Sequence, residues 1–405
     1  MQHAQSRARS RRWIGRAGLA SLAGLVAFGV QPALPALAGL WSAPVQLPGS
    51  CGSSVAVNQA GAMAAGGTFT AADGTTHVQV CTSPDGTTWQ PADLGPGGDE
   101  PHGGQHPVVA LSPDGHAVAV WGGSTVGVQA AVRPPGDGWT TPETLTGDLN
   151  DVSGGIVLGM DGAGNAIAAW AGFYAGASHY AVLAAGGRHF GKVQTLSTSN
   201  AQGAAHNLGL AVSPDGHVVV AFATNRDAIW AASGTLAGGL STPVLVAGGD
   251  YLNVSAPKVA LDDAGQASLV WSQSARTEAA TRSPGGTWSA PAVLASQPSS
   301  SVATAIDGAG NAIAVFGSSY SWHLAGGSWA PAAALPAGSS GGLAAADPAD
   351  TFVYADSGGT AFTFGAGAAS FGPGSGPRGS LADLKIVPGR AVMLAAGAVS
   401  TETVN

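Results

Sequence analysis

The feature that most constrains this chain is a short phrase that returns five times in register, as in VALSPDGHAVAVW and LGMDGAGNAIAAW. In each copy a strand-like run meets a turn rich in Asp and Gly, and an aromatic residue follows the turn glycine by six places. Small apolar residues alternate before that aromatic, which places them on one face of a strand. A hairpin repeated in this way is typical of a β-propeller or a related array. The five aromatic residues, which we expect to pack between blades, are Trp121, Trp170, Phe222, Trp271 and Phe316.

Two markers give the number of repeats. One is a closing strand of the form W-S-x-P-x-x-L, clearest at residues 288–294 and 139–145. The other is the turn between the first two strands of a unit, which can be followed eight times, and which is weakest in the last two copies. The turns are 58–61, 112–115, 161–164, 213–216, 262–265, 307–310, 347–350 and 387–390.

The closing strand of the last unit is found at the other end of the chain. Residues 41–47, WSAPVQL, have no opening strands before them, whereas the last unit, from about residue 381, has opening strands and no closing strand. Pairing the two would close a ring and remove its exposed edges. The sequence therefore predicts an all-β fold, an eight-bladed propeller of four-stranded antiparallel blades, closed by the N-terminal strand. Seven blades is the alternative if the unit around Asp347 is irregular.

The first 38 residues have the pattern of an export signal. Five arginines precede an apolar stretch at 17–30, and A-L-A at 36–38 is a small-residue cleavage site. Residues 10–16, SRRWIGR, also resemble the twin-arginine pattern, so both twin-arginine and general secretory export stay open. Residues 39–405 then form a single propeller domain, which we expect to be secreted or periplasmic, monomeric and without a membrane span.

Removing the leader makes the chain acidic. The 15 basic residues fall by five while the 23 acidic residues remain, which gives 10 − 23, or −13. Nucleic acids and anionic lipids are bound through Lys and Arg, so this balance argues against both as partners. The two cysteines, Cys51 and Cys81, are expected to form a disulfide in an exported protein. A pair of buried thiols is the alternative.

The segment 81–89, CTSPDGTTW, resembles the aspartate-box hairpin of sialidases and related BNR-repeat propellers, one residue shorter than usual. The resemblance implies a structural turn in which Asp and Ser bond to the hairpin backbone. It also raises the question of sialidase-like chemistry, which in that family uses three arginines, a Tyr–Glu pair and an acidic Asp. The mature chain has seven arginines and no Arg-Ile-Pro motif.

One group of candidate binding residues follows the second strands of several blades. Arg226 and Arg276 fall in equivalent loops of neighbouring blades, and two arginines can hold a carboxylate. The alternative is that they are solvated loop charges paired locally. The other members of the predicted site are Asp227, Glu278, Tyr174, Tyr320 and Trp322, of which the aromatic residues are expected in loops where they could stack on a sugar.

The segment DEPHGGQH is a candidate metal site. Two imidazoles four residues apart, with two carboxylates, could supply ligands for zinc, namely Asp99, Glu100, His102 and His106. A solvated polar loop is the alternative, because a loop does not direct these side chains together. No cofactor is expected.

Three functions remain open from the sequence. A non-catalytic propeller that binds a glycan or an envelope protein through its rim loops is favoured, because no convergent catalytic set is present. A sialidase-like glycoside hydrolase and a structural cell-envelope protein are the alternatives.

Overall fold

A computed structural model of the protein describes residues 41–98, 106–123, 125–147, 155–172, 177–198, 205–226, 228–248, 255–273, 275–367, 371–372, 374–376, 378–388 and 390–403. The chain divides into a short unit, Met1–Pro35, and a second unit, Ala36–Asn405, to which all the described residues belong. The proposed export leader lies outside the described residues. Within them, no helix is long and apolar enough to cross a membrane.

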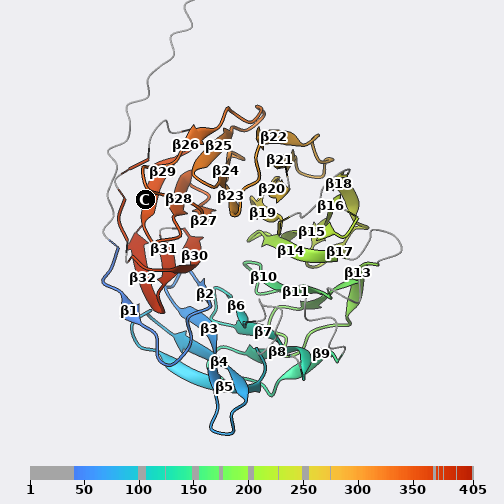
Figure 1. Ribbon diagram of the computed structural model, residues 1–405. Coiled ribbons are helices and arrows are strands. Elements are labelled where there is room, and N and C mark those ends of the chain that lie inside the picture. Colours follow the sequence, from blue (N-terminus) through green and yellow to red (C-terminus); the bar gives the residue numbers. More distant parts are fainter. Residues whose placement is uncertain are drawn as a thin grey trace, which may run out of the picture. The chain divides into compact units, whose positions relative to one another are not determined.

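The second unit is built from eight antiparallel sheets that follow one another around a ring (Figure 1). The prediction of an eight-bladed β-propeller is thereby confirmed. Six blades have four strands. Blade 4 has a fifth, because β17 and β18 both pair with β16, and blade 7 has three strands in its described part, followed by a bridge between Ala361 and Ser375.

The strands of each blade run outward from the ring centre in chain order, except that the outermost strand of blade 8 is β1. Blade 1 has β2 (Ser54–Val57), β3 (Met63–Thr70), β4 (Thr76–Ser83) and β5 (Gln90–Pro96); blade 2 has β6 (Val108–Leu111), β7 (Ala117–Gly123), β8 (Gly127–Arg133) and β9 (Glu143–Thr146); and blade 3 has β10 (Ile156–Met160), β11 (Ala166–Ala171), β12 (Ser178–Leu183) and β13 (Gln194–Ser197). Blade 4 has β14 (Ala205–Val212), β15 (His217–Thr224), β16 (Ala228–Thr235), β17 (Gly239–Leu240) and β18 (Val244–Ala247); blade 5 has β19 (Lys258–Leu261), β20 (Ala267–Gln273), β21 (Arg276–Arg282) and β22 (Ala292–Ala295); and blade 6 has β23 (Val302–Ile306), β24 (Ala312–Phe316), β25 (Ser319–His323) and β26 (Ala333–Ala334). Blade 7 has β27 (Leu343–Ala346), β28 (Thr351–Ala355) and β29 (Ala361–Gly365), and blade 8 has β30 (Leu381–Val387), β31 (Arg390–Ala395), β32 (Ala398–Thr403) and β1 (Val45–Gln46).

The repeated turn owes its sequence to backbone geometry. The turn glycine has a positive φ in each of the first six copies, for example 88° at Gly164 and 83° at Gly310. Asp307 Oδ1 accepts hydrogen bonds from the backbone N–H groups of Ala309 and Asn311, at 3.0 and 2.8 Å. Asp161 does the same in blade 3. Glycine tolerates this left-handed conformation, and the aspartate supplies acceptors that the turn backbone needs.

The five aromatic residues that follow the repeated turns are buried between blades, as the sequence predicted. Trp170 of blade 3 packs against Val118 and Val120 of blade 2, and Trp271 of blade 5 packs against Val219 and Ala221 of blade 4. Each pair of neighbouring blades has its own cluster of buried side chains, the pair formed by blades 8 and 1 included. The core is therefore a series of inter-blade layers.

The ring closes where the sequence predicted. In β1, Val45 and Gln46 pair with Val399 and Ala398 of β32. A disulfide between Cys51 and Cys81, with Cα atoms 6.0 Å apart, then ties the segment after β1 to strand β4 of blade 1. The predicted disulfide is confirmed, and it lies in the seam between the last blade and the first.

The hairpin at residues 83–89 has the turn that its resemblance implies. The hydroxyl of Ser83 accepts a bond from the Gly86 N–H at 2.8 Å, and Asp85 Oδ1 accepts bonds from the N–H groups of Thr87 and Thr88 at 2.8 and 2.9 Å. These backbone donors lower the pKa of Asp85 to about 2, so the turn keeps an ionised carboxylate at neutral pH.

Candidate functional site: the linker face and the central channel

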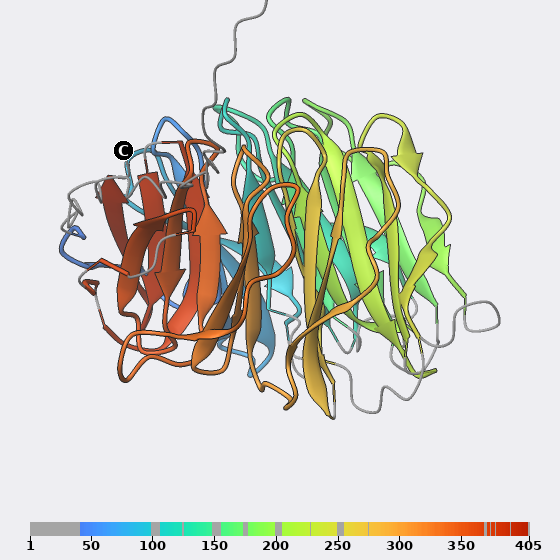
Figure 2. The same cartoon turned by 90° about the horizontal axis from the view of Figure 1, so that it is seen from above.

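The two ends of the blades carry different connections. We call the end with the blade-to-blade linkers and the turns between second and third strands the linker face. The opposite end, which carries the Asp-Gly turns such as 307–310, is called the turn face. Figure 2 shows the strands running between these two ends. All the innermost strands begin at the linker face and end at the turn face.

Arg226 and Arg276 lie at the linker face of neighbouring blades, as the sequence indicated, but only Arg226 is in a turn. Arg276 and Glu278 were expected in a loop and instead belong to a strand, because β21 already begins at Arg276. Arg226 follows β15, is exposed, and makes no ion pair with a described residue. Arg276 begins β21, and its Nε lies 3.0 Å from Glu278 Oε1. The two arginines therefore differ: one is held by a carboxylate of its own blade, and the other extends into solvent.

Glu278 is the fixed centre of a polar cluster that also contains Arg276 and Gln273. Its side chain is 3% exposed, whereas that of Arg276 is 43% exposed. The Gln273 amide donates a hydrogen bond to Glu278 Oε2 at 2.7 Å. Burial raises the pKa of Glu278 and the Arg276 charge lowers it. The pair therefore holds the guanidinium in one orientation, with its outer part open at the linker face.

Two of the predicted aromatic residues are not where the sequence placed them. Tyr320 and Trp322 were expected in an exposed loop, but both lie in β25 and are 6% and 7% exposed. Trp322 contacts Phe352 edge-on, with ring centroids 4.9 Å apart, in the layer between blades 6 and 7. The loop placement was wrong, because the turn before β25 is a tight one at Gly317, which has a φ of 56°.

The remaining rim and metal candidates are only partly described. Tyr174 and Asp227 lie outside the described residues, as do Asp99, Glu100 and His102. His106 is described and exposed, just before β6. Within the described part of the chain, no group of three or more His, Cys, Asp or Glu side chains could hold a metal ion. The zinc hypothesis therefore stays a prediction.

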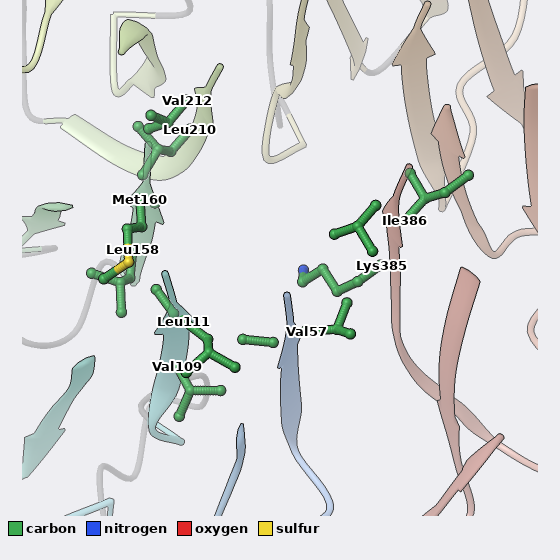
Figure 3. Close-up of a pocket in the computed structure, with 13 residues that line it drawn as sticks. Val57, Val109, Leu111, Leu158, Met160, Leu210, Val212, Lys385 and Ile386 are labelled. Atoms are coloured by element: carbon green, nitrogen blue, oxygen red, sulfur yellow. The ribbon is translucent and has the colours of Figure 1, made fainter. Parts of the chain in front are cut away.

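A channel runs between the innermost strands. One cavity of about 320 Å³ is lined by apolar side chains that include Leu111, Met160 and Val212, and by Lys385 (Figure 3). A second cavity of about 430 Å³ shares several of these walls and opens among the turns of the turn face, beside Asp161 and Asp307. The repeat predicts that every innermost strand surrounds one axis, but it does not predict which side chains line the channel.

At the turn-face mouth of the channel, the carboxylates of Asp161 and Asp307 accept hydrogen bonds from the backbone of their own turns. Asp307 also accepts a bond from the Asn311 side-chain amide at 2.8 Å, and Asp161 accepts one from Asn165 at the same distance. Burial raises the pKa of Asp262 and of Asp263, the latter also because of the nearby Asp215 charge. The mouth is therefore an acidic rim formed by structural turns.

Comparison with known proteins shows the fold. No family model and no curated protein matches the chain. Among solved structures it is similar to the Dos1 propeller, with a TM-score of 0.61 and 10% identity over 90% of this chain and 95% of that one. It is also similar to the BP39L lectin from Burkholderia pseudomallei, with a TM-score of 0.56 and 15% identity over 81% of this chain and 99% of the lectin. Sqt1 from Saccharomyces cerevisiae has a TM-score of 0.56 and 10% identity, covering 90% and 99% of the two chains. By its sheets and by these similarities, the chain is a β-propeller.

Proposed function

We propose that this chain is a non-catalytic binding protein that holds a carbohydrate at the linker face, beside Arg276. The observation that carries the proposal is the ion pair between Arg276 and the buried Glu278, with Gln273 bonded to the same carboxylate. An oriented, half-exposed guanidinium offers donors in a fixed fork, which suits pairs of neighbouring hydroxyl groups. One of the similar propellers, BP39L, is a lectin, which supports this choice of ligand class.

The hydrolase alternative has less support from the same residues. A sialidase-like grip needs several arginines free to hold one carboxylate, whereas Arg276 already faces the carboxylate of Glu278. Of these two arginines, only Arg226 makes no ion pair with a described residue. We therefore place binding ahead of glycoside hydrolysis, and ahead of a purely structural envelope role, which would need no oriented polar cluster at the rim.

The experiment is a thermal-shift screen against a panel of sugars that includes sialic acid, with calcium, zinc or a chelator as added conditions. A ligand that binds only the native state must raise the unfolding midpoint. The affinity of any sugar that does so is then measured by titration calorimetry for the natural protein and for Arg276→Ala.

We expect Arg276→Ala to weaken sugar binding by about tenfold or more, which corresponds to the loss of charge-assisted hydrogen bonds. Arg188→Ala is the matched control, because Arg188 is also a half-exposed arginine, paired with Asp137 on another part of the surface. Equal weakening by both substitutions, or no sugar that shifts the midpoint, would contradict the proposal. Cleavage of a fluorogenic sialoside that is lost in both Arg226→Ala and Arg276→Ala would favour the hydrolase instead.

A further inference from the structure

The turn-face mouth of the channel contains one side chain that departs from the repeat. Each of the eight turns between first and second strands places its second residue in the wall of the cavity of about 430 Å³. Six of these residues are proline or glycine and one is glutamine, whereas blade 5 has an aspartate. In chain order they are Gln59, Pro113, Gly162, Pro214, Asp263, Gly308, Pro348 and Pro388. A departure that the fold itself does not need marks a candidate functional position.

The carboxylate of Asp263 has no partner in the described part of the chain. Asp263 is half-buried, and it makes no ion pair with any described residue. Burial raises its pKa, and the charge of Asp215 in the neighbouring turn of blade 4 raises it further. A partly desolvated negative charge therefore lies at the mouth with another negative charge, and no positive one, beside it.

The preceding residue, Asp262, lacks a bond that its counterparts have. In blade 6 the amide of Asn311 donates to Asp307 at 2.8 Å, and blade 3 has the same bond. Blade 5 has Gln266 at this position, and its amide donates instead to the carbonyl of Gly310, at 2.7 Å. Asp262 is 6% exposed and lines the cavity, and it accepts a bond from the Gln266 N–H at 2.7 Å. No side chain of the described residues donates a hydrogen bond to it.

The cavity at this mouth has charges of one sign. Four aspartates are among its lining residues, and none of the lining residues is Lys, Arg or His. The turns around the mouth are described except at Gly389. Lys385 lines only the other cavity and is paired with Asp383 at 3.0 Å. Arg390 of blade 8 lies against Gly61 of blade 1, outside the lining. The residues that line the cavity therefore supply no counter-charge for its carboxylates.

An apolar wall follows the mouth on the inner side. Leu111, Met160 and Val212 are the last residues of β6, β10 and β14, and they line both cavities. Figure 3 shows these side chains on one side of the channel. A molecule that enters from the turn face meets the carboxylates first and the apolar wall next.

We propose that the turn-face mouth binds an amphipathic primary amine, whose ammonium group lies between Asp262 and Asp263 and whose apolar tail extends along Leu111, Met160 and Val212. An ammonium group has three N–H donors and one positive charge, which suit two neighbouring carboxylates that have acceptor positions to spare. The apolar wall adds affinity with each methylene group that it removes from water. The prolines of the mouth have no N–H to donate, so they give an anionic head group nothing to bind.

The test is titration calorimetry at pH 7 with octylamine as the probe. We expect octylamine to bind, and octanoate and methylamine to bind at least about tenfold more weakly. Octanoate reverses the charge of the head group, and methylamine lacks the tail. Equal affinity for octylamine and octanoate would overturn the proposal.

Two substitutions test the two carboxylates separately. Asp263→Asn removes the unpaired charge and should weaken octylamine binding by about tenfold or more. Gln266→Asn keeps every carboxylate but supplies Asp262 with the amide bond seen in blade 6, so it should weaken binding by about threefold or more. The matched control is Asp114→Asn, at an exposed turn aspartate of blade 2 outside the cavity lining. Equal weakening by Asp263→Asn and Asp114→Asn would contradict the assignment.

A second readout uses the natural protein and needs no variant to fold. With methionine methyl groups labelled by ¹³C, octylamine should shift the NMR signal of Met160, which lines the channel. The signals of Met63 and Met393, which are buried between blades, should stay constant. A Met160 signal that does not move at saturating octylamine would also overturn the proposal. This site lies at the opposite end of the blades from Arg276, so it does not depend on sugar binding there.

Discussion

Glu402 is a buried acid in β32, next to the strand that closes the ring. It is 4% exposed, its Oε2 has no hydrogen-bond partner among the described residues, and burial raises its pKa from 4.5 to about 7. The folded protein therefore retains a proton that the unfolded chain loses. The buried position of Glu402 should leave the free energy of unfolding unaffected below pH 4.5. It should lower that free energy as the pH rises from 4.5 to 7, and the loss should persist above pH 7.

Glu402→Gln should remove this loss, because a neutral amide has no proton to lose. At pH 8 we expect a higher free energy of unfolding, by up to about 3 kcal/mol, and at pH 4 we expect almost no difference. Urea unfolding at pH 4, 6 and 8 measures this. Asp137→Asn, at an exposed ion pair, should change stability little at any of these pH values. A Glu402→Gln effect that does not depend on pH would contradict the assignment.

At the scale of the element, the Asp-Gly turn is stabilised mainly by its first residue. Asp307 is 1% exposed and accepts three hydrogen bonds within its own turn. Asp307→Ala removes the buried acceptor of these three hydrogen bonds and should lower the free energy of unfolding by about 2 kcal/mol. The control is Asp215→Ala in the blade 4 turn, where Ser213 is the buried first residue and Asp215 is exposed. Urea unfolding measures the loss of unfolding free energy in each variant. Equal losses would show that the position of the aspartate within the turn is unimportant.

The outermost strands show how far local sequence predicts an element. The W-S-x-P-x-x-L pattern correctly marks the fourth strand, but its regular ladder begins after the proline, as at Glu143 after Pro142 and Ala292 after Pro291, with a single bridge before it between Trp288 and Arg282. Proline has no N–H to donate to a ladder, so regular pairing begins after it. The aromatic residue of the same pattern then packs beside the strand, as Trp288 does against the layer between blades 4 and 5.

At the scale of the whole molecule, the seam between blades 8 and 1 is the place where the ring is covalently reinforced. The disulfide closes a separation of 30 residues between Cys51 and Cys81. On the chain-entropy model a loop of this size contributes about 3 to 4 kcal/mol. Because β1 lies just before Cys51, the bond also limits how far that strand can leave β32.

Replacing both cysteines with serine should therefore lower the free energy of unfolding by about 3 to 4 kcal/mol. Urea unfolding with and without a reductant measures this effect. The reductant should destabilise the natural protein and leave the double variant unchanged. If the reductant destabilised both to the same extent, the disulfide would not be the stabilising element.

The sequence by itself determined the eight blades, the turn chemistry, the aromatic layers and the closing strand. These depend on strand alternation, on the left-handed glycines and on chain order, all of which repeat locally. It also assigned Arg276 and Glu278 to one group of rim residues, but as loop residues, whereas both belong to β21.

Only the tertiary structure decided which side chains from distant blades meet. It buried Tyr320 and Trp322 against blade 7, left Arg276 half-exposed over a buried Glu278, and placed Lys385 among the apolar side chains that line the channel. The physical reason is that burial and electrostatic environment are set by neighbours far away in the chain, which no local repeat specifies.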